Sequence, residues 1–174
     1  MAETVFIKEI SRIKRVRKEL ERALDITINI TRDGIEIGGK EGFNDYIPIQ
    51  VLHAIEMGFL VPSALKLKDE GFMFEIMSIK QHARPSRLAT IKGRLIGKQG
   101  RALETLSELT GCDIKIKDYE VGIIGRTSDI KFAINALTNL MHGSPHSAVY
   151  AYLERSRHLR EMKEEEEESF SKKL

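Results

Sequence analysis

The chain has 174 residues, a formal net charge of +2 and 41% hydrophobic residues, which suits one globular domain or two small ones. Its single cysteine, Cys112, excludes a framework of intramolecular disulfides and fits a reducing compartment. No hydrophobic run approaches the ~20 residues of a membrane span, and the charged start of the chain does not resemble a secretory signal. We therefore expect a cytoplasmic protein.

The first half of the chain predicts a helix, two strands and a second helix. Apolar residues recur at helical spacing over residues 10–24, whereas isoleucines alternate with polar residues over 26–30 and 35–37. Residues 47–57 have helical spacing again. The following segment, 62–71, reads as an apolar linker, which predicts that the two halves of the chain pack together.

The second half predicts the order strand, helix, loop, helix, strand, strand, helix. The loop is Gly97-Lys98-Gln99-Gly100, and Gly111 is expected to end the helix that follows it. The last helix is expected to have Thr127 or Ser128 as its N-cap. The elements cover, in chain order, residues 72–80, a helix opened by Pro85, residues 101–110, 112–116, 121–124 and a helix that ends at Met141.

The two halves resemble two copies of one unit. A fixed offset places Ile26 on Ile114 and Ile28 on Ile116, but the first copy lacks the glycine loop and the helix before it. We therefore expect three parts: residues 1–70 without the loop, residues 71–145 with it, and residues 146–174 as a C-terminal helix and acidic tail. The five glutamates from Glu164 to Glu168 form either a solvated helix end or a tail that folds back on a basic surface.

Positive charge is concentrated around the glycine loop. Between Ile76 and Leu103 the chain has seven Lys and Arg residues and no Asp or Glu. Such segregated charge attracts polyanions, and glycines let the backbone approach a phosphate closely because no Cβ intervenes. The sequence therefore predicts a nucleic-acid contact site. The seven residues are Lys80, Arg84, Arg87, Lys92, Arg94, Lys98 and Arg101.

Other readings of these motifs are less consistent with the sequence. A phosphate-binding P-loop is excluded because the spacing from Gly93 is one residue short and Gln99 replaces the Ser or Thr that would hold magnesium. His142 and His146 are four residues apart, but Gly143 and Pro145 lie between them, so no metal site is expected. No nucleophile–base pair stands out, so we expect neither an enzyme nor a cofactor.

Several segments resemble a known family. Residues 91–101, with the pattern apolar-Ile-Gly-x-x-Gly-Arg, resemble the signature of KH domains, and residues 109–114 and 123–125 lie where that family has matching elements. Residues 55–59 and 143–150 are similar to segments of the archaeal two-KH small-subunit ribosome-assembly factors. This resemblance implies an α+β fold with two tandem type I KH domains, the first degenerate. Each would have a three-stranded sheet with helices on one face, and a C-terminal helix would follow.

The resemblance also implies a function. KH domains clamp four single-stranded nucleotides, with the loop on the backbone and an adjoining groove on the bases. The implied RNA is the 3′ region of the small-subunit rRNA precursor. The implied protein partners are a Nob-type endonuclease, the dimethyladenosine methyltransferase and the alpha subunit of initiation factor two. The alternatives are a general single-stranded RNA-binding protein and an adaptor for translation or rRNA-processing factors.

We expect the RNA-binding residues to lie on the loop, its two helices and the flanking strand. Ile96 would form groove wall, while Lys115 and Lys117 either face water or contact RNA. Arg84, Arg87 and Arg94, at the start of and on the helix that precedes the loop, could instead form an ordinary solvated face. The expected set is Arg87, Lys92, Gly93, Arg94, Ile96, Gly97, Lys98, Gln99, Gly100, Arg101, Lys115 and Lys117.

Overall fold

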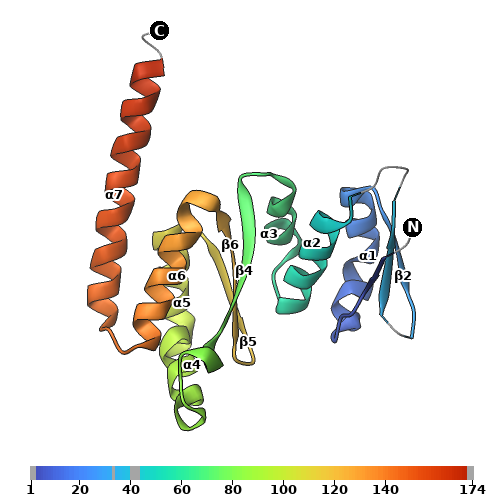
Figure 1. Cartoon of the computed structure of the whole chain (residues 1–174), viewed down its shortest axis with the longest axis horizontal. Coiled ribbons are helices and arrows are strands. Elements are labelled where there is room, and N and C mark those ends of the chain that lie inside the picture. Colours follow the sequence, from blue (N-terminus) through green and yellow to red (C-terminus); the bar gives the residue numbers. More distant parts are fainter. Residues whose placement is uncertain (1–2, 33, 40–43, 172–174) are drawn as a thin grey trace.

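The computed structural model describes residues 3–32, 34–39 and 44–171, which form two three-stranded antiparallel sheets and seven α-helices (Figure 1). In each sheet the third strand of the chain order lies in the middle. The first sheet contains β1 (Glu3–Val5), β2 (Thr27–Ile30) and β3 (Ile35–Gly38). The second contains β4 (Phe72–Ser78), β5 (Asp113–Lys117) and β6 (Glu120–Arg126).

The helices separate and cover these sheets. Those of the first half are α1 (Ile10–Leu24), α2 (Tyr46–Met57), α3 (Val61–Leu65) and the 3₁₀ turn η1 (Lys66–Lys68). Those of the second half are η2 (Ile79–Gln81), η3 (Pro85–Arg87), α4 (Leu88–Ile96), η4 (Lys98–Gly100), α5 (Arg101–Thr110), α6 (Thr127–Met141) and α7 (His146–Ser171). Within the described ranges no helix is both long and apolar enough to cross a membrane.

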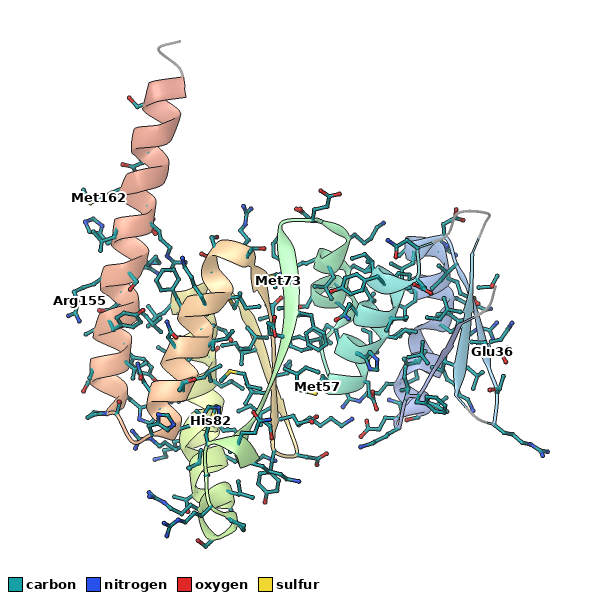
Figure 2. All side chains as sticks on the ribbon, viewed as in Figure 1. Glu36, Met57, Met73, His82, Arg155 and Met162 are labelled. Atoms are coloured by element: carbon teal, nitrogen blue, oxygen red, sulfur yellow. The ribbon has the colours of Figure 1, made fainter. Side chains whose placement is uncertain are left out.

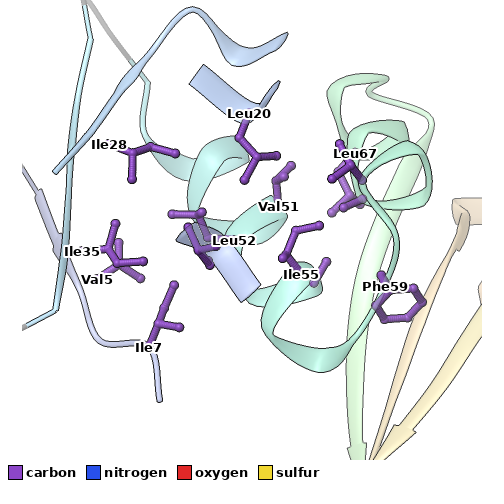
Figure 3. Close-up of a cluster of buried hydrophobic side chains, with 14 of the residues drawn as sticks. Val5, Ile7, Leu20, Ile28, Ile35, Val51, Leu52, Ile55, Phe59 and Leu67 are labelled. Carbon is purple, nitrogen blue, oxygen red and sulfur yellow. The ribbon is translucent and has the colours of Figure 1, made fainter. Parts of the chain in front are cut away.

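Two hydrophobic cores hold the layers together. The first lies between the first sheet and α1 and α2, where alternation along the strands buries Ile28, Ile35 and Ile37 (Figure 3). Glu36, between the two buried isoleucines of β3, lies at the outer side of that sheet (Figure 2). The second core fills the space between the second sheet and α4 to α6, and the start of α7 closes it. The α+β class and the C-terminal helix are thus confirmed.

The second sheet is covered on both faces. Ile124 of β6 belongs to the first core, and the Phe59 ring, just after α2, meets the Phe74 ring of β4 edge to face at 5.9 Å. Gly122 makes room for this contact, because a Cβ there would lie 2.9 Å from the Phe59 ring and 3.0 Å from Met57. The predicted packing of the two halves is therefore confirmed.

The segment expected to be a linker is an ordered part of that contact. It forms α3 and η1, and it buries Val61, Ala64 and Leu67. The Lys66 ammonium donates a 2.7 Å hydrogen bond to the Asp113 carboxylate of β5. The segment connects the halves as an ordered contact, because its apolar residues form short helical turns that pack as their composition predicted.

The internal repeat is present in the register of both sheets. Ile28 pairs with Ile37 in the first sheet as Ile114 pairs with Ile123 in the second. The preceding helices end alike, because Asp25 and Gly111 are both left-handed caps, with φ of 53° and 69°. Ile28 therefore corresponds to Ile114, two residues away from the predicted match.

Two local predictions differ from the structure. Strand β1 was missed, because three residues are too short for a pattern. The N-cap of α6 is Arg126, and the side chains of Thr127 and Ser128 do not cap the helix. The Thr127 hydroxyl donates instead to the Gly71 carbonyl oxygen at 3.3 Å, which joins the start of α6 to the start of β4.

The thiol of Cys112 should be unreactive in the folded protein. Its side chain is 2% exposed, and burial raises the pKa of the thiol to about 11. At pH 8 the thiol is therefore protonated and shielded, so a disulfide reagent such as DTNB should react only after denaturant is added. Complete reaction of the native protein within minutes would contradict this packing.

Candidate nucleic-acid interface

The glycine loop joins α4 to α5 through a backbone that ordinary residues rarely adopt. Gly97, Gln99 and Gly100 have φ of 74°, 54° and 79°. A Cβ placed on Gly97 would lie 2.5 Å from the Ala102 Cβ and 2.8 Å from the Ala102 nitrogen. Only glycine fits position 97, since it combines a positive φ with a close backbone approach. The turn lets α5 begin immediately after the loop.

This turn leaves polar groups open to solvent. The side chains of Lys98, Gln99 and Arg101 are exposed, and no side chain caps the first turn of α5. The N–H groups of Gly97, Gly100 and Arg101 already donate within the turn, to the carbonyl oxygens of Gly93, Gly97 and Lys98. The positive end of the α5 dipole attracts an anion, and the two cations add net charge. Glu104 in the same turn is exposed and offsets part of that charge. The arrangement fits a phosphate group.

Replacing Gly97 with alanine should damage the site more than replacing Gly100. Both glycines have a positive φ, which costs an alanine roughly 1–2 kcal/mol. Only Gly97 adds a clash, because no heavy atom lies within 4 Å of a Cβ on Gly100. Thermal unfolding followed by circular dichroism should show the larger loss of stability for Gly97→Ala, and RNA binding should fall with it. Equal losses for the two variants would show that the Ala102 contact can relax.

The expected binding residues divide into exposed and half-buried groups. The exposed ones are Arg87, Gly93, Lys98, Gln99, Arg101 and Lys115. The half-buried ones are Lys92, Arg94, Ile96, Gly97, Gly100 and Lys117. Figure 1 shows α4 and the β5–β6 turn at the same end of the second sheet, away from the C-terminal end of α7. The long helix α7 therefore does not bring its acidic end to the loop.

Arg94 makes contacts within the protein. Its Nε donates to the Leu140 carbonyl oxygen at 3.0 Å, and its guanidinium also donates to the Ser144 carbonyl oxygen. The ring of His146 lies 3.0 Å from the Arg94 carbonyl oxygen, between Nε2 and O. These bonds join α4 to the corner between α6 and α7. Contact of Arg94 with RNA stays a prediction, and its observed contacts position the helix before the loop.

Lys117 is likewise engaged by the first half. Its Nζ donates to the Glu56 carbonyl oxygen at 2.9 Å and lies 3.1 Å from the Glu9 carboxylate. The hydrogen bond from Lys117 lowers the pKa of the Glu9 carboxyl below its usual value. With Lys66 on Asp113 at the other end, both ends of β5 are tied to the first half. Contact of Lys117 with RNA also stays a prediction.

Comparison with known proteins identifies the fold around the loop. A family model described as a eukaryotic type KH domain, type I, from the second KH domain of PNO1, matches residues 73–158. Residues 73–158 are thus similar to a type I KH domain of PNO1. The open glycine loop lies inside this domain, between its first two helices.

Two curated relatives extend the comparison beyond this domain. A KH domain-containing protein of Methanocaldococcus jannaschii is 30% identical over 82% of this chain and 65% of its own length. RNA-binding protein pno1 of Ixodes scapularis is 38% identical over 57% of this chain and 44% of its own length. The chain thus spans less than two thirds of the length of the first relative and less than half of the length of the second.

A solved structure is similar over nearly the whole chain. It comes from a complex of a/eIF2alpha, aDim2p and rRNA from Pyrococcus horikoshii. The TM-score is 0.78 and the identity 29%, over 90% of this chain and 93% of the other. Both halves of the chain therefore have the same fold as a protein that was solved in a complex containing rRNA.

Proposed function

We propose that this chain is a non-enzymatic RNA-binding protein of small-subunit ribosome assembly. It binds the 3′ region of the small-subunit rRNA precursor through its glycine loop. The observation that carries the proposal is the open Gly97–Gly100 backbone at the start of α5, inside a basic segment without acids, on a type I KH domain. The names of similar proteins support the RNA class, since they include RNA-binding and rRNA-complex proteins.

The loop and the edge strand divide the work of recognition. The positive start of α5 and those loop N–H groups that do not donate within the turn bind a backbone phosphate, and Lys98 and Arg101 add charge. Strand β5 lies at an edge of its sheet, so its outer backbone groups are open to the groove side. The exposed Lys115 lies on the other face of the strand from Ile114 and Ile116, the face that Asp113 and Lys117 share. Ile96, half-buried at the end of α4, supplies apolar wall for a base. The protein thus reads the RNA sequence through contacts to the bases and holds the strand through contacts to the phosphates.

The first half positions the second and offers a protein surface. We assign residues 1–70 to a degenerate KH domain, because α1 begins at Ile10, where the second copy has its loop, and no glycine opens the backbone there. The Glu9 carboxylate at the start of α1 also disfavours a phosphate. The proposed partners of this half are a Nob-type endonuclease, the dimethyladenosine methyltransferase and the alpha subunit of initiation factor two. The similar complex, which contains a/eIF2alpha, supports the last of these.

The test compares single-stranded RNA, duplex RNA and salt. A groove fitted to splayed bases should bind a single strand at least tenfold more tightly than a duplex of the same sequence. The logarithm of the affinity should fall linearly with the logarithm of salt concentration, because phosphate contacts release counterions. Fluorescence anisotropy titrations measure both. Equal affinity for the two RNAs would leave only a generic basic patch.

The second candidate is a general single-stranded RNA-binding protein, which the same loop geometry would serve. Crosslinking the native protein to RNA and sequencing the bound fragments separates the two. Enrichment at the 3′ end of small-subunit rRNA supports the proposal, whereas fragments spread over many transcripts support the general protein.

A further inference from the structure

A second cluster of cations lies beside the loop, around one aromatic ring. The Nζ atoms of Lys80 and Lys92 lie 5.8 and 5.7 Å from the centre of the Tyr119 ring. Tyr119 and Lys80 are absent from the binding residues that the sequence predicted. The three side chains come from three elements: η2, α4 and the turn between β5 and β6.

The fold fixes this arrangement from behind. The Ile79 N–H donates to the Tyr119 carbonyl oxygen at 2.8 Å, which ties the β5–β6 turn to the end of β4. Ile79 is fully buried and Ile91 is 5% exposed. Lys80 and Lys92, which follow them in the chain, are therefore attached to a rigid part of the second core. The Tyr119 ring is half-buried and packs against that core. Two flexible lysines are thus gathered on a fixed ring.

The charge of this cluster is not neutralised by the part of the protein that the structure describes. Neither Lys80 nor Lys92 forms an ion pair with a described carboxylate. Asp118 and Glu120 flank Tyr119 in the chain but do not lie within ion-pair distance of either ammonium. A ring attracts cations through its quadrupole and leaves their charge unbalanced. Two cations that share one ring, neither with an ion-pair partner among the described residues, therefore favour an anion beside them.

We propose that Lys80 and Lys92, held on Tyr119, bind a backbone phosphate of the RNA outside the four nucleotides gripped at the loop. This inference rests on the proposed function and extends its site. Lys92 precedes Gly97 by little more than one helical turn, which places it about 7 Å along the helix axis from the loop. A strand held by the loop can therefore reach the cluster, and the chemistry recognised is a phosphodiester, independent of base.

The test uses the full chain and two RNA lengths. The double variant Lys80→Gln, Lys92→Gln should weaken binding of a single-stranded dodecanucleotide roughly tenfold at moderate salt. Its salt slope should be lower by about 0.7, since each neutralised phosphate of a single strand contributes about 0.7 and the two lysines share one phosphate. Binding of a tetranucleotide, which fills only the loop site, should fall much less than binding of the dodecanucleotide.

Matched variants separate the site from its charge. Lys131→Gln removes an exposed lysine that also lies over a ring, that of Phe132 at 5.2 Å, but on α6; it should leave the slope unchanged. Tyr119→Phe should bind as wild type, and Tyr119→Leu, which removes the ring but keeps apolar bulk, should lose about threefold on the dodecanucleotide.

Three outcomes would overturn the inference. The first is an unchanged salt slope in the folded double variant. The second is an equal loss on both RNA lengths. The third is an equal loss in the Lys131→Gln control. If any one of these outcomes occurs while loop variants still lose RNA binding, the proposed function stands and the second phosphate site does not. If the wild-type chain fails to bind single-stranded RNA, both are wrong.

Discussion

Replacing Lys98 and Gln99 with aspartate should abolish single-stranded RNA binding while the protein stays folded. Both side chains are exposed and their residues form part of no core, so the melting temperature should change little. The double variant replaces one cation and one amide with two carboxylates beside the phosphate position. Repulsion, together with loss of a charge-assisted contact, should weaken binding at least a hundredfold. Anisotropy titration measures the affinity, and circular dichroism checks the fold.

A control with the same change of charge decides whether the loop or the net charge is responsible. Lys131 and Asn135 are exposed and four residues apart on α6. Replacing both with aspartate changes the net charge of the protein as much as the loop variant does. We expect this control to bind RNA within threefold of wild type. A loop variant that binds as tightly as its control would remove the loop from the site.

The loop was predictable from sequence because its determinants are local. Glycines at positive φ, the helices on either side and the absence of acids all lie within one short stretch of chain. The same holds for most helices and strands, whose periodicity is a local property. The structure adds why position 97 requires glycine: a Cβ there would clash with Ala102. This contact could not be read from the sequence pattern.

The repeat was found with its register shifted by two, and the cause is the strand period. Isoleucines alternate in both copies, so an alignment moved by two residues keeps every apolar position apolar. The left-handed caps Asp25 and Gly111 decide the register, because each ends the helix before the strand. Asp25 was not recognised as a cap, since glycine is the usual residue there.

The interactions that sequence could not give are those between distant segments. Lys117 and Glu56 are 61 residues apart, and Arg94 and Leu140 are 46 apart, yet each pair is joined by a hydrogen bond. Both cations were assigned to RNA because their neighbours in sequence are basic or on a groove strand. The charge of a side chain alone does not distinguish a lysine or arginine that is free to bind a ligand from one that already donates hydrogen bonds within the protein.

Replacing Phe59 with alanine should destabilise the whole chain, since this ring connects the two halves. Phe59 is 3% exposed, belongs to the first core, and contacts both Phe74 and the space above Gly122 in the second sheet. Truncating a buried phenylalanine to alanine costs about 3–5 kcal/mol. Urea unfolding followed by circular dichroism should show one transition with a lower midpoint and an unchanged slope.

The adjacent residue provides the control. Leu60 is 71% exposed, so Leu60→Ala should change the free energy of unfolding by no more than about 0.5 kcal/mol. If Phe59→Ala costs no more than Leu60→Ala, the contact between the halves contributes little. If instead its unfolding curve splits into two steps, the halves fold independently, and the ties from Lys117 and Lys66 to the first half do not couple them. A single shifted transition means that the first half stabilises the sheet beside the proposed RNA site, even though it carries no glycine loop of its own.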